Sequence, residues 1–248
     1  MISRECMLVS IGLYIALSTG SDVHAQYLTE GFDNVAGLTS AGWTMRNNST
    51  SPAGNSYFQG NDLEFTSHLG AANAYIAANF QGASGTQVTE TISNWLITPV
   101  IPSIQNGTTF SFYTRTSINP ASFPDRLQVR LNTTNTGTNV GTLPEEVGNF
   151  TTLLLDINST YQATGTGSYP DAYTNYTASV SGLAMPMDGR FAFRYYVENG
   201  GPNGFNSNYI GIDTLVIAAP VPEPPMIVFS GLIVGARFAF RRWKRNFH

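Results

Sequence analysis

Short segments in which apolar and polar residues alternate constrain the fold of this chain most strongly. Leu127–Leu131 and Phe191–Val197 follow this period-two pattern, and Phe110–Thr114 and Ile210–Ile217 are further apolar segments of strand length. The region between residues 26 and 220 contains no stretch with the sustained periodicity of an amphipathic helix. The pattern therefore predicts an all-β protein.

Turn-forming residue pairs separate these segments. Asn106-Gly107, Asn119-Pro120 and Gly201-Pro202 are typical of tight turns between strands. Many strands with turn-rich connections indicate an antiparallel β-sandwich or jelly roll. The expected core contains the apolar residues Leu127, Val129, Leu131, Phe191, Phe193, Tyr195, Ile210 and Ile212.

The first 25 residues have the pattern of a secretory signal peptide. Arg4 is followed by an apolar core from Met7 to Leu17 and by the small-residue ending Val23-His24-Ala25. Cleavage is expected before Gln26. The alternative is that this apolar segment forms a first buried strand or helix.

Removal of the signal peptide would leave an acidic body without cysteine. The only cysteine, Cys6, lies in the segment expected to be removed, so we expect neither a disulfide framework nor a thiol nucleophile. Residues 26–220 contain thirteen Asp and Glu residues against six Arg and no Lys. This balance argues against nucleic-acid binding, because phosphate backbones are bound largely through clustered Lys and Arg. The length of this segment predicts a single domain.

The last segment, residues 221–248, combines prolines, an apolar run and a basic cluster. The apolar run Met226–Ala236 is shorter than the roughly 17–25 residues of a spanning helix, and only its continuation through Arg237 to Phe240 approaches that length. A basic cluster after such a run is held on the cytoplasmic side of a membrane. We therefore expect a C-terminal hydrophobic helix with the membrane-stop residues Arg241, Arg242, Lys244 and Arg245.

The order of these parts resembles the PEP-CTERM sorting signal of Gram-negative bacteria. The residues that match its motif are Val221, Pro222, Glu223 and Pro224. The resemblance implies export, an intermediate anchored in the inner membrane and processing by an exosortase. The mature protein would then be found at the cell surface or outside the cell.

A second resemblance covers residues 28–217. A series of short landmarks follows the order of the choice-of-anchor J domain, a relative of the cleaved-adhesin and MAM-like jelly rolls of secreted bacterial proteins. The landmarks are Glu30–Asp33, Gly42-Trp43, Asn94–Pro99, Phe110–Tyr113, Asp125–Arg130, Arg190–Tyr195 and Tyr209–Asp213. The resemblance implies one jelly-roll domain over residues 26–220, joined to a separate anchor.

The same resemblance implies a structural calcium ion. Its ligands would be Glu30 and Asp33 near the start of the domain and Asp213 near its end. Three converging carboxylates repel one another without a cation, and calcium prefers oxygen ligands. The alternative is that they are ordinary turn and edge acids.

Catalytic motifs are scarce in the body. His68 is its only histidine and has no triad or zinc-ligand spacing around it. A glycosidase would need a pair of carboxylates, for which the candidates are Glu64, Glu90, Asp125, Glu145 and Glu146. We expect a non-enzymatic protein. A secreted carbohydrate-active enzyme with an unrecognised carboxylate pair is the alternative.

Tyrosines in a segment rich in Gly, Ser and Thr suggest a binding role. Tyr161, Tyr169, Tyr173 and Tyr176 could form platforms that stack on sugar rings, or they could pack on the sandwich as loop anchors. The sequence thus predicts an exported surface or matrix protein that acts in adhesion or exopolysaccharide binding in a biofilm. The expected partners are an exosortase, the inner membrane during sorting, and exopolysaccharide or surface glycans.

Overall fold

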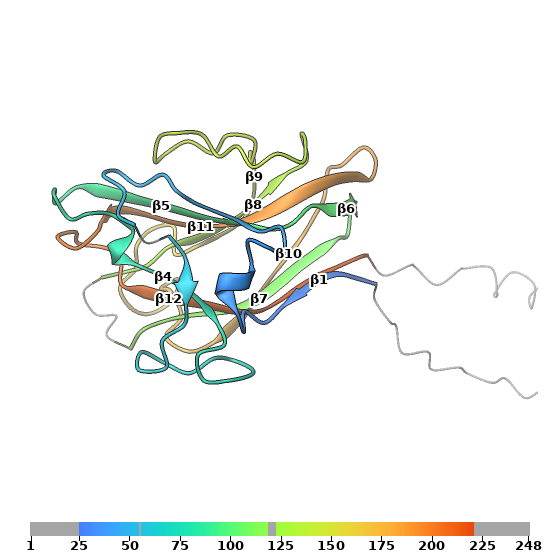
Figure 1. Cartoon of the computed structure of the whole chain (residues 1–248). Helices are drawn as coiled ribbons and strands as arrows, with labels where there is room; N and C mark the ends of the chain where they lie inside the picture. Colours follow the sequence, from blue (N-terminus) through green and yellow to red (C-terminus); the bar gives the residue numbers. More distant parts are fainter. Residues whose placement is uncertain (1–24, 55, 119–122, 221–248) are drawn as a thin grey trace, which may run out of the picture.

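The protein is a β-sandwich made of two antiparallel sheets (Figure 1). The computed structural model describes residues 25–54, 56–118 and 123–220. This part of the chain contains no α-helix, and two short 3-10 turns, η1 (Val35–Gly37) and η2 (Phe80–Gly82), are its only helical elements. The predicted all-β antiparallel fold is confirmed.

The terminal segments lie outside the described residues. The signal peptide, the C-terminal hydrophobic helix, the sorting motif and the membrane-stop cluster predicted from the sequence fall in these segments. Within residues 25–220, apart from the two internal gaps, no helix is long and apolar enough to cross a membrane.

The first sheet, called sheet A here, contains six strands. Its order is β10-β7-β12-β4-β3, and β1 also pairs with β12. All the pairings are antiparallel, so neighbouring strands need no crossover helix. The strands are β1 (Gln26–Glu30), β3 (Phe58–Gln59), β4 (Ile76–Asn79), β7 (Thr109–Thr116), β10 (Thr174–Ser179) and β12 (Tyr209–Ala218).

The second sheet, called sheet B here, also contains six strands. Its order is β2-β5-β11-β8-β9, with β6 paired to β11. The long strand β11 lies at its centre, between β5 and β8. The strands are β2 (Thr44–Asn47), β5 (Glu90–Ile97), β6 (Ile101–Ile104), β8 (Leu127–Asn132), β9 (Thr152–Ile157) and β11 (Met187–Gly200).

The core between the sheets consists of the side chains that alternate inward. All eight residues expected there are buried, each at most 1% exposed. Aromatic rings join the two sheets: the ring centroid of Phe110 lies 5.0 Å from that of Phe191, and that of Phe112 lies 4.8 Å from that of Phe193. Offset and edge contacts at these distances add to the burial of apolar area.

Each sheet also has an outer face that a long loop covers. Residues 60–75, called loop 60–75, connect β3 to β4 and bring Phe65 and Tyr75 against Ala77 and Tyr209 of sheet A. Residues 133–151, called loop 133–151, connect β8 to β9 and pack on sheet B. There Val140 and Phe150 form a small apolar cluster with Trp95, Ile97 and Ala192.

The two ends of the described domain meet. Strand β1 pairs with the end of β12, and Ala219 N donates a hydrogen bond to Ala25 O at 2.9 Å. Strand β12 ends at Ala218, one residue beyond the apolar segment Ile210–Ile217 that the sequence predicts as a strand. The prolines that follow have no N–H to donate to a sheet. The first and last described residues of the domain therefore lie side by side.

Candidate functional site

The three predicted calcium ligands lie around the end of β1, the turn after it and the middle of β12. Glu30 Oε1 accepts a hydrogen bond from Phe32 N at 2.8 Å. Asp33 is exposed in the turn that follows, whereas Asp213 is completely buried in β12. The three residues thus differ strongly in their exposure to water.

Asp213 fixes loop 60–75 to sheet A. Its Oδ2 accepts hydrogen bonds from the backbone N–H groups of His68 at 2.8 Å and Leu69 at 3.0 Å, and its Oδ1 accepts one from Thr214 N at 2.5 Å. The pairing of β12 with β7 is irregular just after Asp213, and Thr214 has a φ of 52°. Burial raises the pKa of the Asp213 carboxyl, although these N–H donors oppose the rise.

Asp33 reaches the same loop. A Cβ atom built on Gly70 would lie 3.2 Å from Asp33 Oδ1. The fold therefore brings Asp33 and Asp213 to one loop. Among the residues that the structure describes, however, no group of three or more His, Cys, Asp or Glu side chains is arranged to hold a metal ion. Calcium binding stays a prediction.

His68 belongs to this loop and has a packing role. Its ring stacks on Tyr113, with 3.7 Å between the ring centroids, and its Nδ1 lies 2.9 Å from Thr214 Oγ1. Tyr173 also approaches the ring, at 5.7 Å. Through these contacts the imidazole packs between loop 60–75 and sheet A.

Two of the five candidate catalytic carboxylates are buried and bound by the protein's own donors. Glu90 accepts hydrogen bonds from Gly85 N at 2.7 Å and Thr86 N at 3.1 Å. Asp125 accepts hydrogen bonds from the hydroxyls of Thr116 and Tyr195, both at 2.5 Å, and burial raises its pKa. These carboxylates hold loops and strands together through hydrogen bonds inside the protein.

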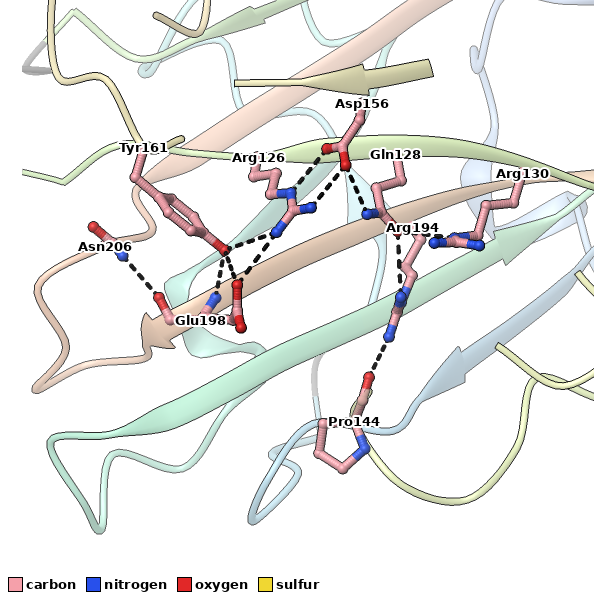
Figure 2. A network of polar contacts seen from close by, with 9 residues as sticks. All are labelled: Arg126, Gln128, Arg130, Pro144, Asp156, Tyr161, Arg194, Glu198 and Asn206. Atoms are coloured by element: carbon pink, nitrogen blue, oxygen red, sulfur yellow. Dashed lines mark hydrogen bonds and ion pairs between the residues drawn. The ribbon is translucent and has the colours of Figure 1, made fainter. Parts of the chain in front are cut away.

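Sheet B carries a polar network on its outer face (Figure 2). At its centre is Arg194 of β11, which is only 2% exposed. Its guanidinium donates to Ser93 Oγ at 3.1 Å, to Gln128 Oε1 at 3.2 Å and to the carbonyl of Pro144 in loop 133–151. Burial lowers its pKa, but an arginine remains charged at neutral pH.

The same network extends to the edge of sheet B. Arg126 forms a two-pronged ion pair with Asp156, at 2.7 and 2.8 Å, and a longer one with Glu198 at 3.3 Å. The Tyr161 hydroxyl accepts a hydrogen bond from Glu198 N at 2.8 Å. Figure 2 shows these side chains directed toward one another, so their polar groups bind one another.

The four tyrosines that were candidates for sugar platforms pack on the body. Tyr161 belongs to the network of Figure 2. Tyr169 is buried, with its hydroxyl 2.6 Å from Thr114 Oγ1. Tyr173 packs edge-on against Phe65, and Tyr176 stacks on Phe112. The alternative role as loop anchors fits these contacts.

An open groove lies at one end of sheet A, where β3, β4 and β12 meet the start of loop 60–75. Its volume is about 540 Å³, within the range of ligand pockets. Amides and aromatic rings dominate its lining, and Glu64 is the one carboxylate among the described residues that line it. The lining residues are Phe58, Gln59, Asn61, Glu64, Asn79, Phe80, Gln81, Asn208 and Tyr209.

Cleaved adhesin domains have a similar architecture. The K1 cleaved adhesin domain of Lys-gingipain from Porphyromonas gingivalis W83 is 21% identical, covers 77% of this chain and 97% of its own, and gives a TM-score of 0.50. The chain is similar in fold to this domain. The K3 domain of the same protein is also 21% identical, with 78% and 98% coverage and a TM-score of 0.46.

A weaker likeness joins the chain to a xylan-binding domain. The CBM22-1 xylan-binding domain from Paenibacillus barcinonensis Xyn10C is 10% identical, covers 80% of this chain and 97% of its own, and gives a TM-score of 0.41. No protein-family model and no curated protein matches the chain.

Sequence reasoning missed the groove. Its residues come from three separate parts of the chain, 58–64, 79–81 and 208–209. Asn61 and Asn208 are two of many asparagines in the chain, and nothing in their flanking residues distinguishes them. Glu64 was singled out only as one of five scattered carboxylates.

Proposed function

We propose that this chain is an exported, non-enzymatic protein of the cell surface or extracellular matrix that binds surface glycans or exopolysaccharide and thereby acts in adhesion. The observation that carries the proposal is the open groove, whose lining of amides and aromatic rings has the chemistry of sugar recognition. The fold shared with a cleaved adhesin domain supports the proposal.

A binding role suits the groove better than catalysis. Glycoside hydrolysis needs two carboxyl groups on either side of the scissile bond. Glu64 is the single carboxylate of the described groove lining, and the buried Glu90 and Asp125 are bound by internal donors. Glu145 and Glu146 are exposed in loop 133–151, which covers the other sheet. The carbohydrate-active enzyme therefore remains the less favoured alternative.

Export and sorting are part of the proposal. The signal peptide would direct export, and the tail, with its Pro222-Glu223-Pro224 triplet, would be held in the inner membrane and processed by an exosortase. The positions of the ends support this arrangement. Strand β12 runs from Tyr209 at the groove to Ala218 beside the tail. Its ten residues span roughly 30 Å at about 3.3 Å each, so an anchored tail would leave the groove facing away from the membrane.

Fractionation of cells that express the full chain tests the sorting proposal. Deleting residues 221–248 should release the protein from the membrane fraction and leave its melting temperature nearly unchanged. Replacing Pro222-Glu223-Pro224 should spare membrane insertion but block processing, because a recognition sequence contributes nothing to bilayer affinity. Unfolding of the tail-deleted protein, or normal processing after the triplet replacement, would contradict the proposal.

A further inference from the structure

The polar side chains of the groove differ in how far the protein already uses them. Gln59 is fully engaged: its Nε2 donates to Phe32 O at 2.9 Å and to Asn73 O at 2.8 Å, and its Oε1 accepts from Val35 N at 2.9 Å. Asn79 Oδ1 accepts a hydrogen bond from Gln81 N at 3.0 Å. These side chains build the walls of the groove.

Two exposed side chains at the rim keep hydrogen-bonding capacity. Asn61 Oδ1 accepts from Leu63 N at 3.1 Å, but no described residue accepts a hydrogen bond from Asn61 Nδ2. Glu64 Oε2 accepts from Ser117 Oγ at 2.9 Å, and its second oxygen has no donor among the described residues. The rim thus offers one amide donor and one carboxylate acceptor.

Asn208 adds an unpaired donor at the groove. Its backbone is fixed on both sides, because Asn208 N donates to the buried Asp125 Oδ1 at 2.7 Å and Asn208 O accepts from Phe80 N at 2.9 Å. Its Nδ2 is buried and has no hydrogen-bond partner in the described structure. Such an orphan donor is costly unless something satisfies it. The terminal torsion of an asparagine is broad, so the amide can turn toward a ligand acceptor while the backbone stays fixed.

Aromatic rings supply the apolar side of the site. Phe58 and Phe80 line the groove and are only partly buried, and Phe58 packs edge-on against Tyr209 with 5.8 Å between their centroids. Partly exposed rings beside amides suit a ligand that has an apolar C–H face and hydroxyl groups around its edge.

From these contacts we propose that the groove binds an uncharged, hydroxyl-bearing sugar unit, with Asn208 and Asn61 donating to its oxygens and Glu64 accepting from its hydroxyls. The inference deepens the glycan binding proposed above and rests on it. Glu64 is the only charged residue of the described lining, so this lining contains no positively charged side chain to pair with an acidic sugar. A carboxylated sugar would meet like-charge repulsion, which selects against acidic glycans.

Binding measurements on the full exported protein test the inference. The probes are three neutral polysaccharides, hydroxyethylcellulose, galactomannan and dextran, and two carboxylated ones, polygalacturonate and alginate. Affinity electrophoresis of the wild type should show retardation by at least one neutral probe and weaker retardation by both carboxylated probes. Asn208→Ala should weaken binding of the retarding neutral probe about tenfold, the usual effect of losing one well-placed hydrogen bond. Asn61→Ala should act in the same direction.

The Glu64→Gln variant removes the charge of this side chain and keeps its shape. It should raise the affinity for polygalacturonate about fivefold, because it removes the repulsion and keeps an acceptor oxygen. Asn175→Ala on β10 and Glu145→Gln in loop 133–151 are matched controls outside the groove and should bind as the wild type does. Asn61 and Glu64 are exposed, so their variants answer the question even if Asn208→Ala lowers the melting temperature.

The possible failures are distinct. If the wild type binds a polysaccharide while Asn61→Ala and Asn208→Ala bind it equally well, the groove assignment is overturned and the proposed function stands. A preference for polygalacturonate or alginate would overturn the uncharged ligand class. Absence of binding to all five probes would overturn both the inference and the proposed glycan-binding function.

Discussion

The two outer faces of the sandwich are covered by loops that are held in opposite ways. Loop 60–75 lies on sheet A and is held by a buried anion, Asp213, which accepts hydrogen bonds from the loop's backbone N–H groups. Loop 133–151 lies on sheet B and is held by a buried cation, Arg194, which donates to loop carbonyls of Pro144 and Glu146. Each buried charge is satisfied mainly by backbone dipoles and other neutral groups.

The difference between the two faces lies in what remains available for a ligand. On sheet B, Trp95, Gln128 and Arg194 are at most 3% exposed, and the polar groups of Figure 2 bind one another. On sheet A, loop 60–75 leaves a groove beside it, in which Asn208 keeps an unpaired donor. A face whose polar groups are all paired serves stability, whereas a face with unpaired groups beside open space can serve binding.

The largest expected effect comes from removing Arg194, the buried cation that holds loop 133–151 on sheet B. Arg194→Ala should lower the free energy of unfolding by about 3–5 kcal/mol, because it leaves several buried acceptors without a donor and creates a cavity. Arg194→Lys should recover only part of the loss, because an ammonium group lacks the fork of the guanidinium. Denaturant unfolding measures both values. Arg46→Ala, an exposed arginine opposite Trp95 on the same sheet, is the control and should stay within about 0.5 kcal/mol of the wild type.

Removing Asp213, the buried anion that holds loop 60–75 on sheet A, should lower the free energy of unfolding less. Asp213→Ala should lower the free energy of unfolding by about 2 kcal/mol, because the freed N–H groups of the loop can reach water more easily than the buried Ser93 and Gln128 acceptors of Arg194 can. Hydrogen exchange should show lost protection at His68 and Leu69 and unchanged protection in loop 133–151. Equal loss of protection in both loops would mean that the two attachments are one cooperative unit.

Calcium should act on the sheet A side alone. At a calcium concentration ten times its Kd, binding to the folded state would add about 1.4 kcal/mol and raise the melting temperature. Asp33→Asn should abolish this increment without destabilising the protein in chelator, because Asp33 is exposed. Glu145→Gln is the control with the same charge change. Identical melting curves in calcium and in chelator would remove calcium from the description of this protein.

The smallest expected effect is a pH dependence. Burial raises the pKa of Asp213 above its ordinary 3.8, so the folded state binds this proton more tightly than the unfolded state. The free energy of unfolding should therefore fall as pH rises from 3.8 through the folded pKa, and the loss is complete above it. Asp213→Asn should lack this component. Subtracting its unfolding curves from those of the wild type cancels the similar contribution of Asp125, whose pKa burial also raises. A difference independent of pH would contradict the assignment.

Sequence periodicity was sufficient for the strands and for the core between the sheets. Side chains alternate along a strand, so the apolar set Leu127, Val129 and Leu131 had to share one face, and it is buried. The same alternation places Gln128 and Arg130 on the opposite face, but it does not say what covers that face. A charged residue between aromatic neighbours, such as Arg194 after Phe193, is the only feature of the local sequence that indicates a covering loop on this face.

By itself, the sequence determined an antiparallel all-β body that ends before the prolines of the tail, because periodicity and turn chemistry are local properties of the chain. The tertiary structure decided which loop covers which face, that Asp213 and Arg194 hold those loops, and that Asn61, Glu64 and Asn208 line one groove. These contacts join residues far apart in the chain, for example the 145 positions between His68 and Asp213. Strand register and loop placement set such contacts, and both follow from the packing of the whole domain.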